Sequence, residues 1–272
     1  MNDIIPELQD LTYLKWSKTR KSSGTAGSFL KSYDDTGDRM LYYKLSDYDP
    51  LKGIVGHECV NEIIAQRLMT LLDIPHLSYT LIHALVNIND IEYETYLCRS
   101  LDYKAPGESK IPLDEYYELY KNTGESPLDF CKRMHWESTI YGMLVIDFLI
   151  INRDRHGANI EVLSDRKKRI VRLSPLFDQG LSFVCRARTL KEMKSFDPMS
   201  DVKLQSFVAS DSAFDNLKLV PKKYLKKLPT VNEDDKKVIF EGLKGVIDKG
   251  YIDKIWEIIY RRWEYIDNLR NT

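Results

Sequence analysis

An aspartate, an asparagine and a second aspartate stand at spacings that suit the transfer of a phosphoryl group. Asp154 and Asn159 lie five residues apart in "NRDRHGAN", directly after an apolar run, and Asp178 follows in "FDQG". Phosphotransferases use one aspartate to handle the acceptor hydroxyl, and an asparagine and a second aspartate to hold magnesium at the nucleotide phosphates. Such oxygen ligands are those that Mg²⁺ prefers. The pattern therefore predicts Asp154 as the catalytic residue, Asn159 and Asp178 as metal ligands, and ATP and Mg²⁺ as cofactors.

The same segment also has a purely structural interpretation. Taken alone, Asp154 and Asn159 fit a turn at the end of a helix, where such side chains cap the helix or form Asx turns. A hairpin predicted over residues 160–176 lies between Asn159 and Asp178 and favours the phosphotransfer interpretation. The neighbouring polar residues are interpreted as structural or phosphate-facing groups rather than as catalysts: Arg153, Arg155 and His156.

A stretch rich in glycine and hydroxyl residues, "SSGTAGS" at residues 22–28, lies between the first two predicted strands. A glycine-rich loop in this position could cover the nucleotide phosphates. The stretch lacks a complete G-x-G-x-x-G, and a flexible turn is an equal alternative. The hydroxyl of Ser22 could add a phosphate contact. The residues assigned here to ATP binding are Ser23, Gly24, Thr25, Ala26 and Gly27.

Lys44 lies in the third predicted strand, within "MLYYKLS". On a strand it could point into a cleft and contact phosphates, or it could extend into solvent. The helix predicted next carries Glu58 and Glu62 one turn apart, and either carboxylate could pair with Lys44 or face solvent. The residues alone thus predict a phosphate-binding lysine and leave its partner open.

Short strands and one helix make up the first part of the chain. Alternating patterns and turn residues predict three antiparallel strands within residues 11–46 and two more strands at 77–90 and 92–103. Apolar residues at helical spacing predict a helix at 55–73, after the third strand. We therefore expect a sheet of about five strands with one helix.

Helices dominate beyond residue 103, interrupted by the hairpin, with "YKAPGESKIP" joining the two parts. The predicted fold class is α+β with two lobes: an antiparallel-sheet N-lobe over residues 1–104 and a mostly helical C-lobe over residues 105–272. A ligand would bind in the cleft between them. The helices are predicted at 112–122, 126–135, 138–151, 234–249 and 251–269.

Together these segments resemble the HipA-like Ser/Thr protein kinases, including the short CtkA type, over most of the chain. "NRDRHGAN" and "LSPLFDQG" are similar to that family's N-x-D-x-H-x-x-N loop and later P-L-x-D segment. "VNEIIAQRLMTLLDIP" is similar to the family's N-E helix, which selects Glu62 over Glu58 as the partner of Lys44. The resemblance implies a two-lobed protein-kinase-like fold, with His156 on the phosphate side of the nucleotide.

"YLCRSLDY" resembles the hinge of these kinases, whose backbone meets adenine. This places Arg99 and Leu101 beside the base and Asp102 near the ribose. The resemblance implies an ATP- and Mg²⁺-dependent kinase that acts on a Ser/Thr residue of a protein substrate. Full-length HipA toxins carry an additional N-terminal subdomain that contributes to partner contacts, and a first strand near residue 13 leaves no room for it. An antitoxin-like partner and a toxin role are therefore left open. Autophosphorylation of the glycine-rich loop is also left open.

Composition narrows the class of protein further. Of 272 residues, 43% are hydrophobic and 30% charged, which is typical of a folded globular chain, and the net charge of -1 provides no basic field for nucleic acid. Four cysteines without a CxxC pair predict neither a zinc site nor a disulfide framework. The chain shows no signal peptide or membrane-spanning stretch. We therefore expect a cytoplasmic protein without direct nucleic-acid or membrane partners, with delivery to another cell left open.

Two other functions fit the same residues. Kinases of small molecules or lipids with a related fold share the spacing of Asp154 and Asn159. A nucleotide-binding pseudokinase would act as a binding module without transfer. The second alternative is disfavoured because the acidic and amide positions, including Asp178, are intact.

Overall fold

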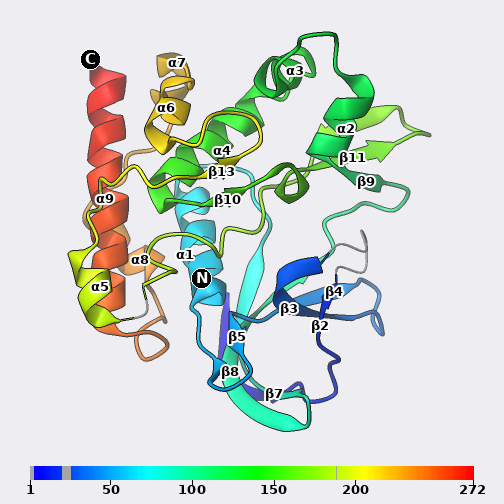
Figure 1. Cartoon of the computed structure of the whole chain (residues 1–272), viewed down its shortest axis with the longest axis vertical. Coiled ribbons are helices and arrows are strands. Elements are labelled where there is room, and N and C mark those ends of the chain that lie inside the picture. Colours follow the sequence, from blue (N-terminus) through cyan, green and yellow to red (C-terminus); the bar gives the residue numbers. More distant parts are fainter. Residues whose placement is uncertain (1–2, 20–25, 188) are drawn as a thin grey trace.

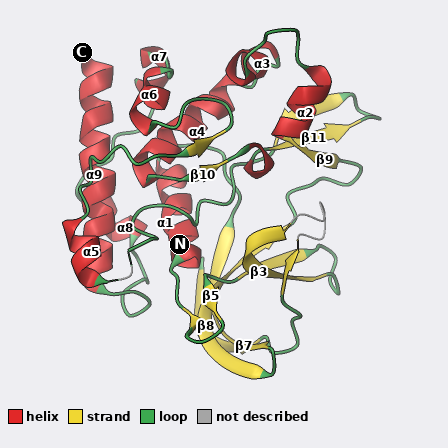
Figure 2. Cartoon of the chain, in the orientation of Figure 1, coloured by secondary structure: helices red, strands yellow, loops and turns green. Residues whose placement is uncertain are grey.

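The computed structural model describes residues 3–19, 26–187 and 189–272. A six-stranded sheet forms one end of the molecule and most of the helices form the other (Figure 1, Figure 2). In space the strands follow the order β1-β7-β8-β4-β3-β2. Their bounds are β1 Ile4–Asp10, β2 Ser17–Thr19, β3 Ala26–Asp34, β4 Leu41–Lys44, β7 Tyr79–Ile88 and β8 Ile91–Leu101, and a small hairpin of β5 (Tyr48–Asp49) and β6 (Gly53–Ile54) follows β4.

The sheet has one strand more than predicted. Strand β1 pairs in parallel with β7, whereas the neighbouring pairs from β7 to β2 are antiparallel. The sequence "IIPELQD" gave no clear strand signal, because most of its side chains are half-buried or exposed and do not alternate cleanly. The proline at position 6 lies on an edge strand, where a missing N–H is tolerated.

Helix α1 (Glu58–Leu71) connects the sheet to the helical part. It packs against β7 and β8 on one side and against α4 (Glu137–Ile150) and α8 (Asp235–Ile239) on another. Buried polar side chains on this helix need hydrogen-bond partners, because burying a polar group without one costs free energy. Arg67, for example, is 1% exposed and donates to Asp3 and to the carbonyl oxygens of Ile239 and Glu241. One cluster of buried apolar residues joins α1 and one face of the sheet to the helical part, and a second cluster lies within the sheet region.

Helix α4 is the central helix of the second part, and it leads into the candidate catalytic segment. It is apolar and largely buried. Ile151 then adopts a left-handed conformation with φ of 54°, and its side chain is fully buried. This conformation is unfavourable for a β-branched residue, so the burial of Ile151 offsets a local strain at the turn into residues 152–159.

The remaining elements complete the second part of the molecule, in which α4 packs against α3, α6 and α9. The predicted hairpin is present as β11 and β12, and the joining segment adds β9 as a third strand beside β11. The segment after α4 forms β10 and the short helix η1, and β10 pairs in parallel with β13. The bounds are β9 Ser109–Pro112, β10 Asp154–Arg155, η1 Gly157–Asn159, β11 Glu161–Asp165, β12 Ile170–Leu173, β13 Gln205–Ser206, α2 Leu113–Tyr120, α3 Pro127–Arg133, α5 Leu190–Ser195, α6 Ala213–Lys218, α7 Lys222–Leu225 and α9 Lys249–Asn271.

The helix predicted at 234–249 is wrong in length. Only α8 is helical there, and the chain then turns through two glycines with positive φ, Gly242 at 71° and Gly245 at 92°. Glycine adopts this backbone conformation without steric cost, so "EGLKG" ends the helix early. The three short helices α5, α6 and α7 were not predicted, because each is too short to show a helical period.

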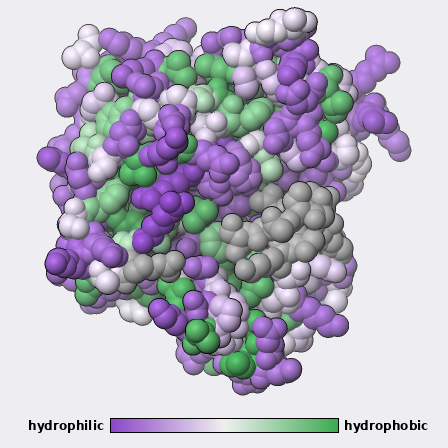
Figure 3. Space-filling view, viewed as in Figure 1, coloured by the Kyte–Doolittle hydropathy of each residue, from purple (hydrophilic) through white to green (hydrophobic). Residues whose placement is uncertain are grey.

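The face shown in Figure 3 is mostly hydrophilic, and the hydrophobic residues on it form small separate groups. Isolated apolar residues of this kind are normal on a protein surface. Within the described part of the chain, no helix has the length and apolar character needed to cross a membrane.

Candidate active site

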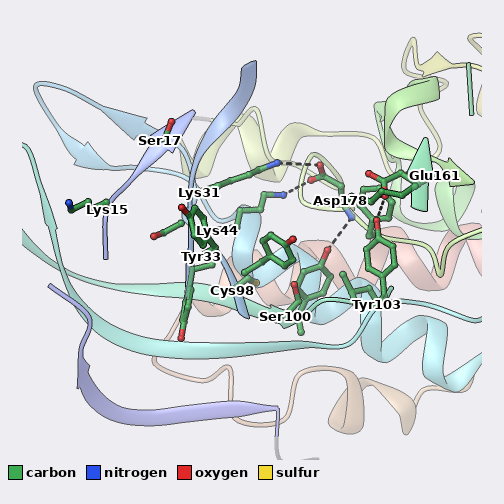
Figure 4. A pocket seen from close by; sticks show the side chains of 17 residues that line it. Lys15, Ser17, Lys31, Tyr33, Lys44, Cys98, Ser100, Tyr103, Glu161 and Asp178 are labelled. Carbon is green, nitrogen blue, oxygen red and sulfur yellow. Dashed lines mark hydrogen bonds and ion pairs between the residues drawn. The ribbon is translucent and has the colours of Figure 1, made fainter. Parts of the chain in front are cut away.

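A cavity of about 180 Å³ lies where the sheet meets the helical part. Figure 4 shows Lys31 of β3 and Lys44 of β4 pointing toward Asp178, and Tyr103 pointing toward Glu161. The described residues that line it are Lys15, Ser17, Lys31, Ser32, Tyr33, Tyr42, Tyr43, Lys44, Leu77, Tyr79, Cys98, Ser100, Tyr103, Lys110, Glu161, Phe177 and Asp178.

Lys44 ends strand β4 and bridges two carboxylates. Its Nζ lies 2.9 Å from Oε1 of Glu62 and 2.5 Å from Oδ1 of Asp178. The ion pair with Glu62 that the sequence predicted is therefore present. Burial opposes the charged ammonium, but the carboxylates of Asp178 and Glu62 outweigh it and hold the pKa of Lys44 well above its ordinary value. Lys44 is thus a permanently charged cation at the cavity wall.

Glu62 fixes this lysine and also fixes the loop that carries Asp178. Its carboxylate is fully buried and accepts hydrogen bonds from the backbone amides of Gln179 at 2.8 Å and Gly180 at 3.1 Å. A buried carboxylate with three donors is well compensated for the loss of water. One side chain on α1 therefore sets the positions of both Lys44 and Asp178.

Gly180 allows the close approach of this loop to α1. A Cβ atom at this position would lie 3.0 Å from Cβ and 3.1 Å from the carbonyl oxygen of Glu58. Asn61, next to Glu62 on α1, donates to the carbonyl oxygen of Gly180 at 2.9 Å and accepts from the Tyr251 hydroxyl at 3.1 Å. Asn61 and Glu62, the "N-E" pair of α1, therefore both hold the loop that carries Asp178.

Asp178 faces a second lysine that the sequence analysis missed. Lys31 of β3 lies directly across from Lys44 of β4, and its Nζ is 4.0 Å from Oδ2 of Asp178. The side chains of Lys31 and Asp178 are 25% and 18% exposed, so both are accessible from the cavity. The pattern "FLKSYDD" gave no sign of this role, because a strand lysine more often extends into solvent.

The predicted catalytic segment forms a tight polar group around Asp154. The Nδ2 group of Asn159 donates to the Asp154 carbonyl oxygen at 2.9 Å and lies 3.5 Å from Oδ2 of its carboxylate. His156 Nε2 is 3.6 Å from Oδ1 of the same carboxylate. The side chain of Asp154 remains 26% exposed. The carboxylate is therefore held in place while it stays open to an acceptor group.

Arg155 corrects one prediction, because it is neither a surface cation nor phosphate-facing. It is 2% exposed and forms a two-pronged ion pair with Asp147 of α4, with distances of 2.9 and 2.8 Å. Its Nη1 group also donates to the carbonyl oxygen of Phe177 at 2.9 Å. Since Arg155 follows Asp154 and Phe177 precedes Asp178, this guanidinium ties the two predicted active-site segments together.

A third polar group of the cavity wall was also missed. The hydroxyl of Tyr103 donates to Oε2 of Glu161, and Lys110 Nζ lies 3.5 Å from the same oxygen. The Tyr103 ring stacks on Phe177 with a centroid distance of 5.8 Å. Burial, followed by the charge of Glu161, raises the pKa of Tyr103 far above its ordinary value. Glu161 belongs to the hairpin predicted over residues 160–176, where nothing in the sequence marks a cavity-facing acid.

Comparison with known proteins identifies the fold. No known family profile matches the sequence, and a search of curated proteins finds no match. The structure is similar to that of the Helicobacter pylori proinflammatory kinase CtkA, with a TM-score of 0.62, 14% sequence identity, and 96% of each chain covered. The chain has a kinase-like fold. The predicted fold class, α+β and protein-kinase-like, is thus confirmed.

A second solved structure shows weaker similarity. It is that of the Shewanella oneidensis MR-1 toxin–antitoxin complex of HipA, HipB and operator DNA. The match covers 94% of this chain and 68% of that chain, with 14% identity and a TM-score of 0.43.

The predicted hinge residues have a less direct relation to the cavity. Side chains alternate along β8, so Cys98 and Ser100 face the cavity whereas Arg99 and Leu101 line a separate depression together with Asp102. Contacts of Arg99 and Leu101 with a base would therefore have to use the backbone, and those contacts stay a prediction. Ser100 and Tyr103 are the hinge residues that line both spaces.

The predicted glycine-rich loop is described only at its end. Ser22, Ser23, Gly24 and Thr25 lie outside the described residues. Ala26 and Gly27 belong to the first residues of β3. The assignment of this loop to the nucleotide phosphates therefore stays a prediction.

The residues present fit a magnesium ion. The amide nitrogen of Asn159 is occupied by the Asp154 carbonyl, so the amide oxygen is the atom that could bind a metal, and Asp178 would add a carboxylate oxygen. Among the described residues, no group of three or more His, Cys, Asp and Glu side chains could hold a metal ion by itself. Magnesium suits such a sparse site, because it usually keeps water and phosphate oxygens as further ligands.

Proposed function

We propose that this protein is an ATP- and Mg²⁺-dependent kinase that phosphorylates serine or threonine in a protein substrate. The observation that carries the proposal is the position of Lys44, which pairs with Glu62 and with Asp178 at the wall of the cavity. A buried cation beside an accessible carboxylate suits phosphate groups together with their metal ion. In this proposal residues 1–104 form the nucleotide-binding lobe and residues 105–272 the catalytic lobe.

Each residue would have a distinct task in the transfer. Lys44 would bind the phosphates, with Glu62 holding its ammonium in place. Asn159 and Asp178 would hold magnesium, which neutralises charge on the phosphates. Asp154 would orient the acceptor hydroxyl and accept its proton, and His156 would contact the phosphates from beside it. Asn159 fixes Asp154 through its backbone carbonyl, so positioning would supply much of the rate.

Phosphate transfer by the whole chain tests the proposal. The protein would be incubated with γ-³²P-ATP and MgCl₂, alone and with dephosphorylated casein, and analysed by autoradiography and phosphoamino-acid analysis. We expect label on serine or threonine. Asp154→Asn should still bind ATP but lose transfer by about 10³-fold or more, since the carboxylate that handles the hydroxyl is gone.

Asp234→Asn is the matched control. Asp234 is 92% exposed and pairs with Lys237 on the surface, so its substitution should leave transfer unchanged. Wild-type turnover in Asp154→Asn would contradict the role of Asp154. Label on tyrosine alone would contradict the proposed Ser/Thr acceptor.

A further inference from the structure

The two carboxylate oxygens of Glu161 differ in their partners within the described residues. Oε2 accepts a hydrogen bond from the Tyr103 hydroxyl and forms an ion pair with the Lys110 ammonium. Oε1 has no hydrogen-bond or ion-pair partner within residues 3–19, 26–187 and 189–272. The residue is 8% exposed and lines the cavity. A largely buried charged oxygen needs a donor, which here must come from solvent or from a bound molecule.

The surroundings of Glu161 hold it rigidly. It begins β11 opposite Pro112 of β9, and Lys110 lies on the same neighbouring strand. Lys110 Nζ is 5.5 Å from the centre of the Tyr103 ring, and that ring stacks on Phe177. Tyr103 stays protonated because burial and the adjacent carboxylate raise its pKa, so it continues to donate to Glu161. A fixed acceptor of this kind can discriminate between ligands.

The position of Glu161 indicates which part of a nucleotide it would meet. Lys31 and Lys44 approach Asp178 from one side, and Tyr103 points toward Glu161 on the other side of Asp178 (Figure 4). A nucleotide with its phosphates at Lys44 would extend its nucleoside toward Tyr103 and Phe177, whose rings suit a base. Ribose hydroxyls and base amino groups are the donors that a nucleoside offers.

We propose that Glu161 accepts a hydrogen bond from a donor on the nucleoside and thereby selects the nucleotide, with Tyr103 and Lys110 as positioning residues. The inference rests on the proposed function and adds a specificity-determining residue to it. The donor is either a ribose hydroxyl or a base N–H, and both share the same chemistry. A hydrogen bond to a charged group discriminates against a ligand without the donor by about 10- to 100-fold.

Nucleotide binding to the full chain tests the proposal. Dissociation constants would be measured by calorimetry for ATP, GTP, 2′-deoxy-ATP, 3′-deoxy-ATP and purine riboside triphosphate, which lacks the amino group of adenine. We expect wild type to bind one of the three analogues of ATP about 10- to 100-fold more weakly than ATP. In Glu161→Gln, ATP should weaken to the level of that analogue, and the preference should vanish. The analogue affected identifies the donor as ribose or base.

Two further variants keep the result interpretable. Glu161→Asp keeps the charge on a shorter side chain, so it should weaken ATP less than Glu161→Gln and retain part of the preference. Glu118→Gln, whose side chain is 64% exposed on α2, should bind every nucleotide as wild type does. Melting temperatures would confirm that each variant is folded.

Failure of this inference differs from failure of the proposed function. Wild-type ratios among the nucleotides in folded Glu161→Gln and Glu161→Asp would overturn the role of Glu161, while phosphate transfer by wild type would continue. If wild type binds ATP without transferring phosphate, the proposed function fails and the binding ratios still decide about Glu161. Absence of nucleotide binding to wild type would overturn both.

Discussion

Two buried ion pairs of similar length have different surroundings. Lys44 and Glu62 are 2.9 Å apart, and Arg155 and Asp147 are 2.8 Å apart. Lys44 lines the cavity and has a second, more accessible partner in Asp178, whose side chain is 18% exposed. Arg155 does not line that cavity and is surrounded by fixed acceptors on α4 and on the loop before Asp178. The first pair faces a ligand space and the second faces the core.

These surroundings decide which pair can take part in binding a ligand. Lys44 can exchange the carboxylate of Asp178 for a phosphate while Glu62 continues to hold it. Arg155 has no such exchange, because each of its contacts joins parts of the protein to one another. We therefore propose that the Lys44–Glu62 pair binds phosphate and that the Arg155–Asp147 pair holds the site together.

Among the changes that test this comparison, breaking the cavity-facing pair should have the largest effect. Lys44→Met and Glu62→Gln should each reduce the phosphorylation rate by about 10²- to 10³-fold, because the phosphates lose their fixed cation. The double variant should be little worse than the worse single variant, since the two residues act as a unit. Phosphorylation rates of wild type, the two single variants and the double variant give the double-mutant cycle. Fully additive losses would show that the pair does not act together.

Arg155→Met should instead lower stability. The free energy of unfolding should fall by about 3–5 kcal/mol, because the carboxylate of Asp147 would remain buried without its cation. Urea denaturation measures this loss, and Arg166→Met on the exposed turn of the hairpin serves as the control. A change below about 1 kcal/mol would mean that the core-facing pair contributes as little as a surface ion pair.

Asp178→Ala should separate metal binding from phosphate binding. Calorimetric titration with ATP should show that magnesium no longer strengthens binding, because a ligand of the ion is lost. Without magnesium, ATP should bind about 10-fold more tightly than it does to wild type, since Lys44 loses a competing carboxylate. An unchanged magnesium dependence would make Asp178 a structural partner of Lys44.

Lys31→Met should have the smallest effect of the four. Lys31 lies 4.0 Å from Asp178, whereas Lys44 lies 2.5 Å away and has Glu62 to hold it. We expect ATP to bind about 5- to 10-fold more weakly, consistent with loss of a partly exposed charge. Added salt should also weaken ATP binding less in the variant than in wild type, because the variant has one fewer charge facing the phosphates. Binding equal to that of Lys44→Met would show that the two lysines share one role.

Much of the fold could be predicted from the sequence, because strands and long helices have local patterns of apolar residues. The helix around Glu62, the apolar helix before Asn152 and the hairpin after Asn159 were each predicted from such patterns and are present. The helix predicted at 234–249 was wrong because the period of its apolar residues continues past Gly242, where the backbone turns. Periodicity does not show that a glycine needs a positive φ.

The candidate site was predicted where a motif marks it and missed where only tertiary contacts do. The pairing of Lys44 with Glu62 came from the resemblance of the helix to the "N-E" motif, since the residues alone left Glu58 as an alternative. Arg155 and Glu161 carry no such mark. A buried arginine is rare enough that a surface role was the reasonable expectation, and Glu161 faces the cavity only because β9 and Tyr103 pack beside it.

A crystal structure of the full chain with a non-hydrolysable ATP analogue and Mg²⁺ would show whether Lys44 binds the nucleotide phosphates. It should place the phosphates within hydrogen-bond reach of Lys44 Nζ and the metal between Asn159 and Asp178. The nucleoside should lie beside Tyr103, with one donor on Glu161. A nucleotide bound outside this cavity, or bound in it with the base at Lys44 and the phosphates at Glu161, would contradict the account.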